Sequence, residues 1–164
     1  MITSDLIRIA LCDNEFNIIN DERVEKLRTI LGWEDAEIED GVLVKEYGLP
    51  QGQTIQDGFM FINGILDLFD QDHDTKHVLA VNVVKNDVNG LGQELWLSTG
   101  RGAYCSDLHE DPETEELTTQ YGRATTFEGE VRELAVSVAR HHSLRGKKRE
   151  RAIGLVCHLF AVSA

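Results

Sequence analysis

Among the side chains that could take part in chemistry, carboxylates form the densest clusters in this sequence. The densest of these clusters lies at residues 34–40. Five of those seven residues are acidic: Glu34, Asp35, Glu37, Glu39 and Asp40. In an extended segment the acids at 35, 37 and 39 share one face, opposite Ala36 and Ile38. Same-face carboxylates then repeat about every 6.6 Å, which resembles the regular charge of a nucleic-acid backbone. The pattern predicts a surface that occupies a basic, nucleic-acid-binding groove.

A second acidic group spans residues 107–116 and holds six carboxylates: Asp107, Glu110, Asp111, Glu113, Glu115 and Glu116. Carboxylates at this density can pair with the Lys and Arg side chains of a partner and so compete with phosphate. Trp33, beside the first group, is a candidate aromatic anchor for such an interface. The alternative is a solvated acidic surface that keeps the protein soluble, with Trp33 packed over a helix end.

One aspartate pattern is a weak candidate for metal binding. Asp70, Asp72 and Asp74 occupy the positions that open an EF-hand calcium loop. Thr75 stands where that loop needs Gly, and Val81 stands where it needs Glu. The alternative is a polar connection between two elements. The sequence otherwise predicts no metal and no other cofactor.

Signs of enzyme chemistry are few. The segment 145–151, Arg-Gly-Lys-Lys-Arg-Glu-Arg, resembles in part the pyrophosphate loop of GNAT acetyltransferases. Lys148 and Glu150 stand where that family has small residues, and a phosphate cradle disfavours a carboxylate. Cys105 and His109 are a close Cys/His pair outside the apolar segments, and no third catalytic group can be assigned to them. Walker loops, Rossmann glycine fingerprints, Cys-x-x-Cys and His-Glu-x-x-His motifs are absent from the sequence.

The elements that must position these residues follow from hydrophobic periodicity and capping signals. Helices are expected over 4–13, 20–31, 55–69, 125–142 and 149–162, the last of which also fits a strand. Strands are expected over 41–46, 77–84 and 94–98, and residues 100–118 read as a long loop. The sequence therefore predicts a single α+β domain over 1–164, with about five helices around a small antiparallel sheet built on the hairpin 77–98.

The charge of the chain limits its function. The 164 residues have a formal net charge of −13, with −17 over residues 1–120 and +4 over residues 121–164. Direct binding to nucleic acid or to an anionic membrane is not expected, because both attract Lys and Arg. The longest apolar run, 152–162, is about half of the ~20 residues that a membrane span needs, and no secretory signal is visible. Three scattered cysteines imply no disulfide framework, with Cys12 and Cys157 expected to be buried and Cys105 exposed. These features predict a soluble cytoplasmic protein.

The function that the sequence favours is a non-enzymatic acidic inhibitor of a basic, nucleic-acid-handling partner such as a nuclease. Inhibitors of restriction or CRISPR systems and immunity proteins against nuclease toxins share this small, acidic, motif-poor character. One alternative is a small enzyme, either a diverged acyltransferase or a hydrolase that uses scattered acids. The other is an oligomerising structural protein, a homodimer in which the apolar segment 152–162 packs against its copy.

Overall fold

A computed structural model describes residues 6–46, 55–73, 77–86, 92–99, 103–111, 113–114, 116–119 and 121–163. Residues 47–54, Asp74 and Glu115 lie outside these ranges. The helices are α1 (Glu22–Leu31), α2 (Ile55–His73), α3 (Phe127–His141) and α4 (Gly146–Leu159). The strands are β1 (Leu6–Cys12), β2 (Glu37–Glu39), β3 (Val42–Glu46), β4 (His77–Asn86), β5 (Gly92–Ser98), β6 (Ala103–Glu110), β7 (Leu117–Thr119) and β8 (Ala124–Thr125).

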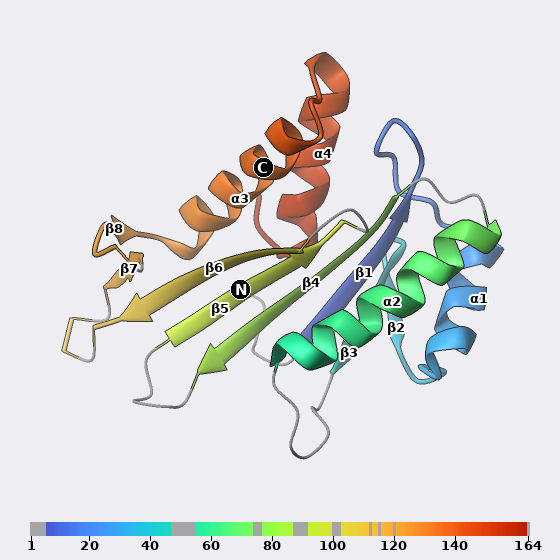
Figure 1. Ribbon diagram of the computed structural model, residues 1–164, viewed down its shortest axis with the longest axis horizontal. Coiled ribbons are helices and arrows are strands. Elements are labelled where there is room, and N and C mark those ends of the chain that lie inside the picture. Colours follow the sequence, from blue (N-terminus) through green and yellow to red (C-terminus); the bar gives the residue numbers. More distant parts are fainter. Residues whose placement is uncertain are drawn as a thin grey trace.

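The strands form two antiparallel groups, three strands in the order β2-β3-β1 and four in the order β5-β6-β7-β8. β4 pairs with β1 on one side and β5 on the other, which gives a sheet of eight strands (Figure 1). The α+β prediction and the strands at 41–46, 77–84 and 94–98 are confirmed. The sheet is larger than expected, and the described residues contain four helices rather than five.

The helix expected over 4–13 is wrong, because this segment is β1, which lies inside the sheet. Ile7, Ile9 and Leu11 point to one face of the sheet, and Ala10 and Cys12 point to the other. A strand covered on both faces reads as a nearly continuous apolar run, which periodicity cannot separate from a buried helix.

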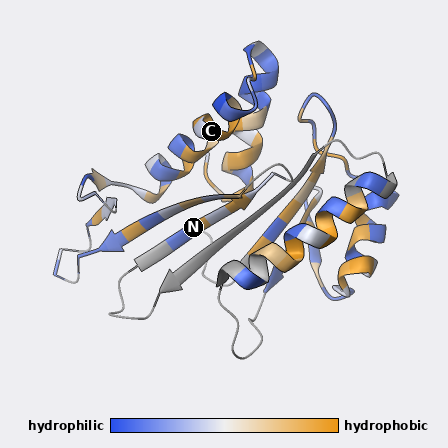
Figure 2. Cartoon of the chain, in the orientation of Figure 1, coloured by the Kyte–Doolittle hydropathy of each residue, from blue (hydrophilic) through white to orange (hydrophobic). Residues whose placement is uncertain are grey.

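Two helix pairs cover opposite faces of the sheet (Figure 1). α1 and α2 bury Val24, Leu27, Ile62, Leu66 and Phe69 against the face that carries Ile7, Ile9 and Leu43. α3 and α4 cover the other face, and Figure 2 shows their hydrophobic turns directed toward the strands. On the first face, the beginning of β5 and the adjoining end of β6 lie beyond α2 (Figure 1).

The segment expected to drive oligomerisation is buried within the chain itself. α4 and the residues that follow it place seven side chains in the core under the sheet: Ala152, Leu155, Val156, Cys157, Leu159, Phe160 and Val162. The exposed apolar stripe that this reading requires is therefore not present along 152–162. The segment is a helix rather than a strand, and it begins at Gly146.

The loop expected over 100–118 is also wrong, since it contains β6 and β7. The hydrophobic signal of β6 is weak, because Leu108 is its one fully buried large apolar side chain. α3 begins at Phe127, two residues after the start expected at residue 125. Its N-cap is Thr126, whose hydroxyl accepts a hydrogen bond from the Gly129 amide at 2.9 Å.

Candidate functional site

The first acidic group lies on β2, the outermost strand at one end of the sheet, and on its flanks. As predicted, its acids are exposed while Ala36 is buried and Ile38 half-buried. Two of the charges are partly neutralised. Lys45 Nζ lies 2.6 Å from Asp35 Oδ1, and this hydrogen bond lowers the pKa of Asp35. An Arg8 guanidinium nitrogen lies 3.7 Å from Glu39. We call Glu34, Asp35, Glu37, Glu39 and Asp40 the β2 strip.

Trp33 is not available as an interface anchor, because it is 8 % exposed and packs into the core beneath α1 and α2. Gly32 ends α1 in the left-handed conformation, and the Trp33 amide donates to the Arg28 carbonyl at 2.9 Å. This closure of the helix end turns the indole inward. The alternative expectation, packing over the helix end, is therefore confirmed.

The second acidic group lies at the other end of the sheet, on β6 and its turn into β7. The antiparallel register adds Glu94, which lies opposite Asp107 on β5. Within the described ranges, none of these carboxylates makes an ion pair with a basic side chain. Burial and the neighbouring Asp107 charge raise the pKa of Glu94. We call the six described carboxylates the acidic end: Glu94, Asp107, Glu110, Asp111, Glu113 and Glu116.

Asp111 has a structural role within the acidic end. Its carboxylate accepts hydrogen bonds from the amides of Glu113 (2.9 Å) and Thr114 (3.4 Å), and its own amide donates to the Glu116 carbonyl at 2.9 Å. These contacts make the turn between β6 and β7. The turn therefore holds Glu113 and Glu116 on a fixed scaffold, while Glu115 lies outside the described residues.

The two acidic groups do not form one surface. Six strand spacings separate β2 from β7, which is about 29 Å at ~4.8 Å per spacing. A partner that contacts both groups at once would have to span the sheet. The structure thus divides the predicted binding residues between two separate surfaces.

Cys105 is exposed, and with Glu94 and Asp107 it forms a group whose potential ligand atoms all lie within 4.8 Å of one another. These three could hold a divalent cation only with Cys105 as thiolate. Burial, and then the charges of Asp107 and Glu94, raise the pKa of this thiol to about 12. His109, four residues along the same strand, is about 13 Å away and cannot activate it.

The other two chemical candidates are not in the conformation that they require. Asp70 and Asp72 belong to α2, whose helical backbone continues to His73, so the loop of a calcium site does not open there. Asp74 lies outside the described residues. The basic segment 145–151 follows helix α3 and enters helix α4, whereas the acetyltransferase loop joins a strand to a helix.

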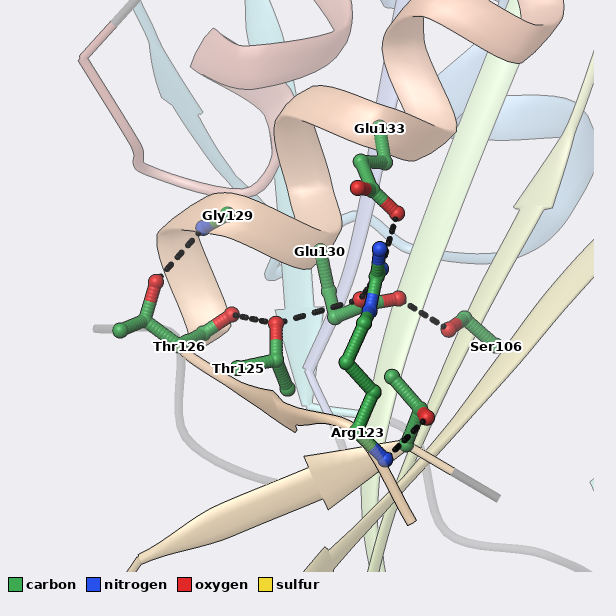
Figure 3. A network of polar contacts seen from close by, with 8 residues as sticks. Ser106, Arg123, Thr125, Thr126, Gly129, Glu130 and Glu133 are labelled. Carbon is green, nitrogen blue, oxygen red and sulfur yellow. Dashed lines mark hydrogen bonds and ion pairs between the residues drawn. The ribbon is translucent and has the colours of Figure 1, made fainter. Parts of the chain in front are cut away.

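A groove of about 420 Å³ opens beside Cys105 and Asp107, between β6, the turn before β8, and α3. Its inner wall is a network around Glu130, a carboxylate that is 7 % exposed (Figure 3). Glu130 accepts hydrogen bonds from Ser106 (3.0 Å) and Thr125 (3.2 Å). Arg123 lies 3.5 Å from Glu130 and 2.8 Å from Glu133. This network joins β6, β8 and α3. Sequence patterns could not predict it, because its members are scattered along the chain and form no motif.

A separate apolar surface lies on the outer side of α2. Met60, Phe61 and Leu68 are 52 %, 67 % and 65 % exposed, and Figure 2 shows hydrophobic turns along this helix. Nothing among the described contacts shows what would cover it.

In comparisons with known proteins, the chain matches no family model, no curated protein and no solved structure. None of the helices within the described ranges is both long enough and apolar enough to cross a membrane.

Proposed function

We propose that this protein is a non-enzymatic inhibitor that binds the basic surface of a nucleic-acid-handling protein through its acidic end. The observation that supports this is the group of six carboxylates without a basic side chain paired to them in the described part of the chain. Neighbouring carboxylates without a basic partner repel one another, which raises the free energy of the unbound protein. A cationic partner lowers that free energy when it binds.

The mechanism is competition with phosphate. Arg and Lys in the partner's groove pair with carboxylates of the acidic end and become unavailable to nucleic acid. The net charge of −13 accelerates association, and salt weakens it. Nuclease-immunity proteins and anti-CRISPR or other anti-defence inhibitors are the classes that this mechanism fits. The β2 strip is a secondary surface in this proposal, because Lys45 and Arg8 already offset part of its charge.

The test is a pull-down from a bacterial lysate with tagged protein at low and high salt, read by mass spectrometry. The bait proteins are the wild type, a Glu110→Lys/Glu113→Lys variant, and a Glu128→Lys/Glu150→Lys variant with the same change in charge. Glu128 and Glu150 are exposed on α3 and α4 and belong to neither the acidic end nor the β2 strip.

We expect the wild type and the helix variant to capture the same nucleic-acid-binding protein at low salt, and the acidic-end variant to lose it. Adding the wild-type protein should then block DNA or RNA binding by the captured partner. Equal capture by all three baits, or capture without any effect on nucleic-acid binding, would contradict the proposal.

A further inference from the structure

Among the described residues, the outer edge of β6 has no strand beside it at residues 103–107. β5 pairs with residues 103–109 of β6, whereas the described pairs with β7 are at residues 108–110. After Thr119 the chain turns back on itself, since Gly122 donates to the Thr119 carbonyl at 2.9 Å and Thr119 donates to the Arg123 carbonyl at 2.8 Å. Among the described residues, no strand therefore adjoins residues 103–107 on this side.

The hairpin fixes which backbone groups face that edge. Asp111 donates to Glu116 across the β6–β7 pair, so the odd-numbered residues of β6 direct their backbone groups toward β7. Residues 103, 105 and 107 continue this alternation where β7 has ended. Tyr104 and Ser106 direct theirs toward β5 instead. A strand with free N–H and C=O groups is a template for pairing with another chain.

The groove at this edge has the shape and charge for a cationic chain. Its rim includes Tyr121, the most exposed of the large hydrophobic side chains at 89 %, and aromatic side chains of this kind anchor interfaces. Asp107, Glu130 and Glu133 line it, with Arg123 as the one cation of the lining. Glu94 lies opposite Asp107 on the open face of the sheet.

We propose that the β6 edge at residues 103–107 binds an extended, Lys- or Arg-rich segment of the partner as an additional strand. This rests on the proposed function and specifies how its partner is held. Backbone hydrogen bonds to residues 103, 105 and 107 provide the pairing, and alternate basic side chains of the segment lie beside Asp107, with Glu94 one strand further on. A second copy of this chain does not fit, since its own edge would bring further carboxylates to carboxylates.

The test uses a fluorescein-labelled peptide, Thr-Lys-Val-Lys-Val-Lys-Thr, and two forms of it N-methylated either at the lysines or at the valines. All three peptides carry the same charge, but each methylation pattern removes the amide donors of one strand edge. We expect one pattern to weaken binding about tenfold or more, because several backbone hydrogen bonds are lost, and the other to bind like the parent.

Hydrogen exchange gives an independent readout on the unmodified protein. The parent peptide should slow exchange at the Cys105 and Asp107 amides and leave the Ser106 amide unchanged. Asp107→Lys should weaken binding more than Glu113→Lys, the same charge change at the turn. Cys105→Pro, which removes one outward N–H from an edge strand, should also weaken it.

Equal binding of all three peptides would overturn the strand pairing, and so would an absence of binding up to millimolar peptide. If the lysate partner is still lost specifically with the Glu110→Lys/Glu113→Lys variant in either case, the proposed function stands and only the strand-pairing inference fails.

Discussion

At the scale of single side chains, the acidic end controls the chemistry of its own thiol. Cys105 is exposed, yet burial of its sulfur and the charges of Asp107 and Glu94 raise the pKa of the thiol to about 12. The nucleophilic form of cysteine is the thiolate, so Cys105 is protonated at neutral pH and inert. This argues against nucleophilic catalysis by Cys105 with His109.

The rate of alkylation measures the reactivity of the Cys105 thiol directly. At pH 8 we expect Cys105 to react with iodoacetamide about a hundredfold more slowly than a free cysteine, whose pKa is about 8.5. Its thiolate fraction is about 2,000-fold lower, and the greater nucleophilicity of a thiolate with a high pKa recovers part of that difference. Asp107→Asn should accelerate the reaction, since it removes a charge that raises the pKa. Intact-mass spectrometry follows the single modification, because Cys12 and Cys157 are buried. A wild-type rate equal to that of free cysteine would contradict the raised pKa.

The raised pKa of Glu94 predicts a pH-dependent stability. A carboxyl whose pKa is higher in the folded state binds protons more tightly there, so folding becomes more favourable as pH falls through that raised pKa. Above it, the ionised Glu94 opposes folding. Glu94→Gln should therefore raise Tm at pH 7, and the gain should shrink as pH approaches the ordinary glutamate pKa of about 4.3. Thermal unfolding from pH 4 to 8 checks this, and a gain independent of pH would contradict it.

At the scale of elements, α2 has an inner and an outer apolar face. Leu66 is 1 % exposed and lies in the core cluster that includes Ile7 and Ile9 of β1, whereas Leu68 is 65 % exposed. Leu66→Ala should lower the free energy of unfolding by about 2–5 kcal/mol, because it leaves a cavity. Leu68→Ala on the same helix should change it by no more than about 0.5 kcal/mol. Urea unfolding compares the two, and similar losses would contradict the placement of α2.

The Glu130 network is the element-scale support of the groove. Two glutamates of α3 contact Arg123, but Glu130 is buried and Glu133 is exposed. Glu130→Ala leaves the Ser106 hydroxyl without its acceptor and the Thr125 hydroxyl with the Thr126 carbonyl at 3.3 Å, so we expect a loss of about 1–3 kcal/mol in the free energy of unfolding. Glu133→Ala removes only an exposed ion pair and should cost less than about 1 kcal/mol. Equal losses in urea unfolding would show that the network does not join these elements.

Sequence patterns identified the elements that have one apolar and one polar side. They missed the strands whose pattern of apolar residues depends on which other elements cover them. α1 has an apolar stripe and a C-terminal glycine, and it was predictable. β1 is apolar on both faces because helices cover both, and only the tertiary structure separates it from a helix. β6 carries few apolar residues, since its outer face is open. Glu94 could not be assigned to the acidic end without the register that places it opposite Asp107.

At the scale of the whole molecule, the charge is divided among three regions. The acidic end and the β2 strip lie at opposite ends of the sheet, and the basic residues gather at the start of α4. The basic region is partly engaged within the chain: Arg151 lies 3.3 Å from Glu15, and the Lys148 ammonium lies 6.0 Å from the centre of the Phe16 ring. The net charge is negative, and among the described carboxylates those of the acidic end are the least compensated.

Two variants with the same net charge separate the contributions of the two acidic surfaces. One is Glu110→Lys/Glu113→Lys/Glu116→Lys at the acidic end, and the other is Glu34→Lys/Glu37→Lys/Asp40→Lys on the β2 strip. The assay is release of a fluorescent DNA duplex from poly-L-lysine, followed by anisotropy at several salt concentrations. Because long-range attraction depends on net charge, both variants should release DNA less well than the wild type at low salt.

At higher salt the two variants should differ in how much DNA they release. At 0.15 M salt the Debye length is about 8 Å, so only groups near the contact still act. The acidic-end variant should then lose more activity, because Lys45 and Arg8 offset part of the charge of the β2 strip. Equal losses at every salt concentration would show that net charge alone governs binding. A larger loss in the β2-strip variant would transfer the binding surface to the opposite end of the sheet.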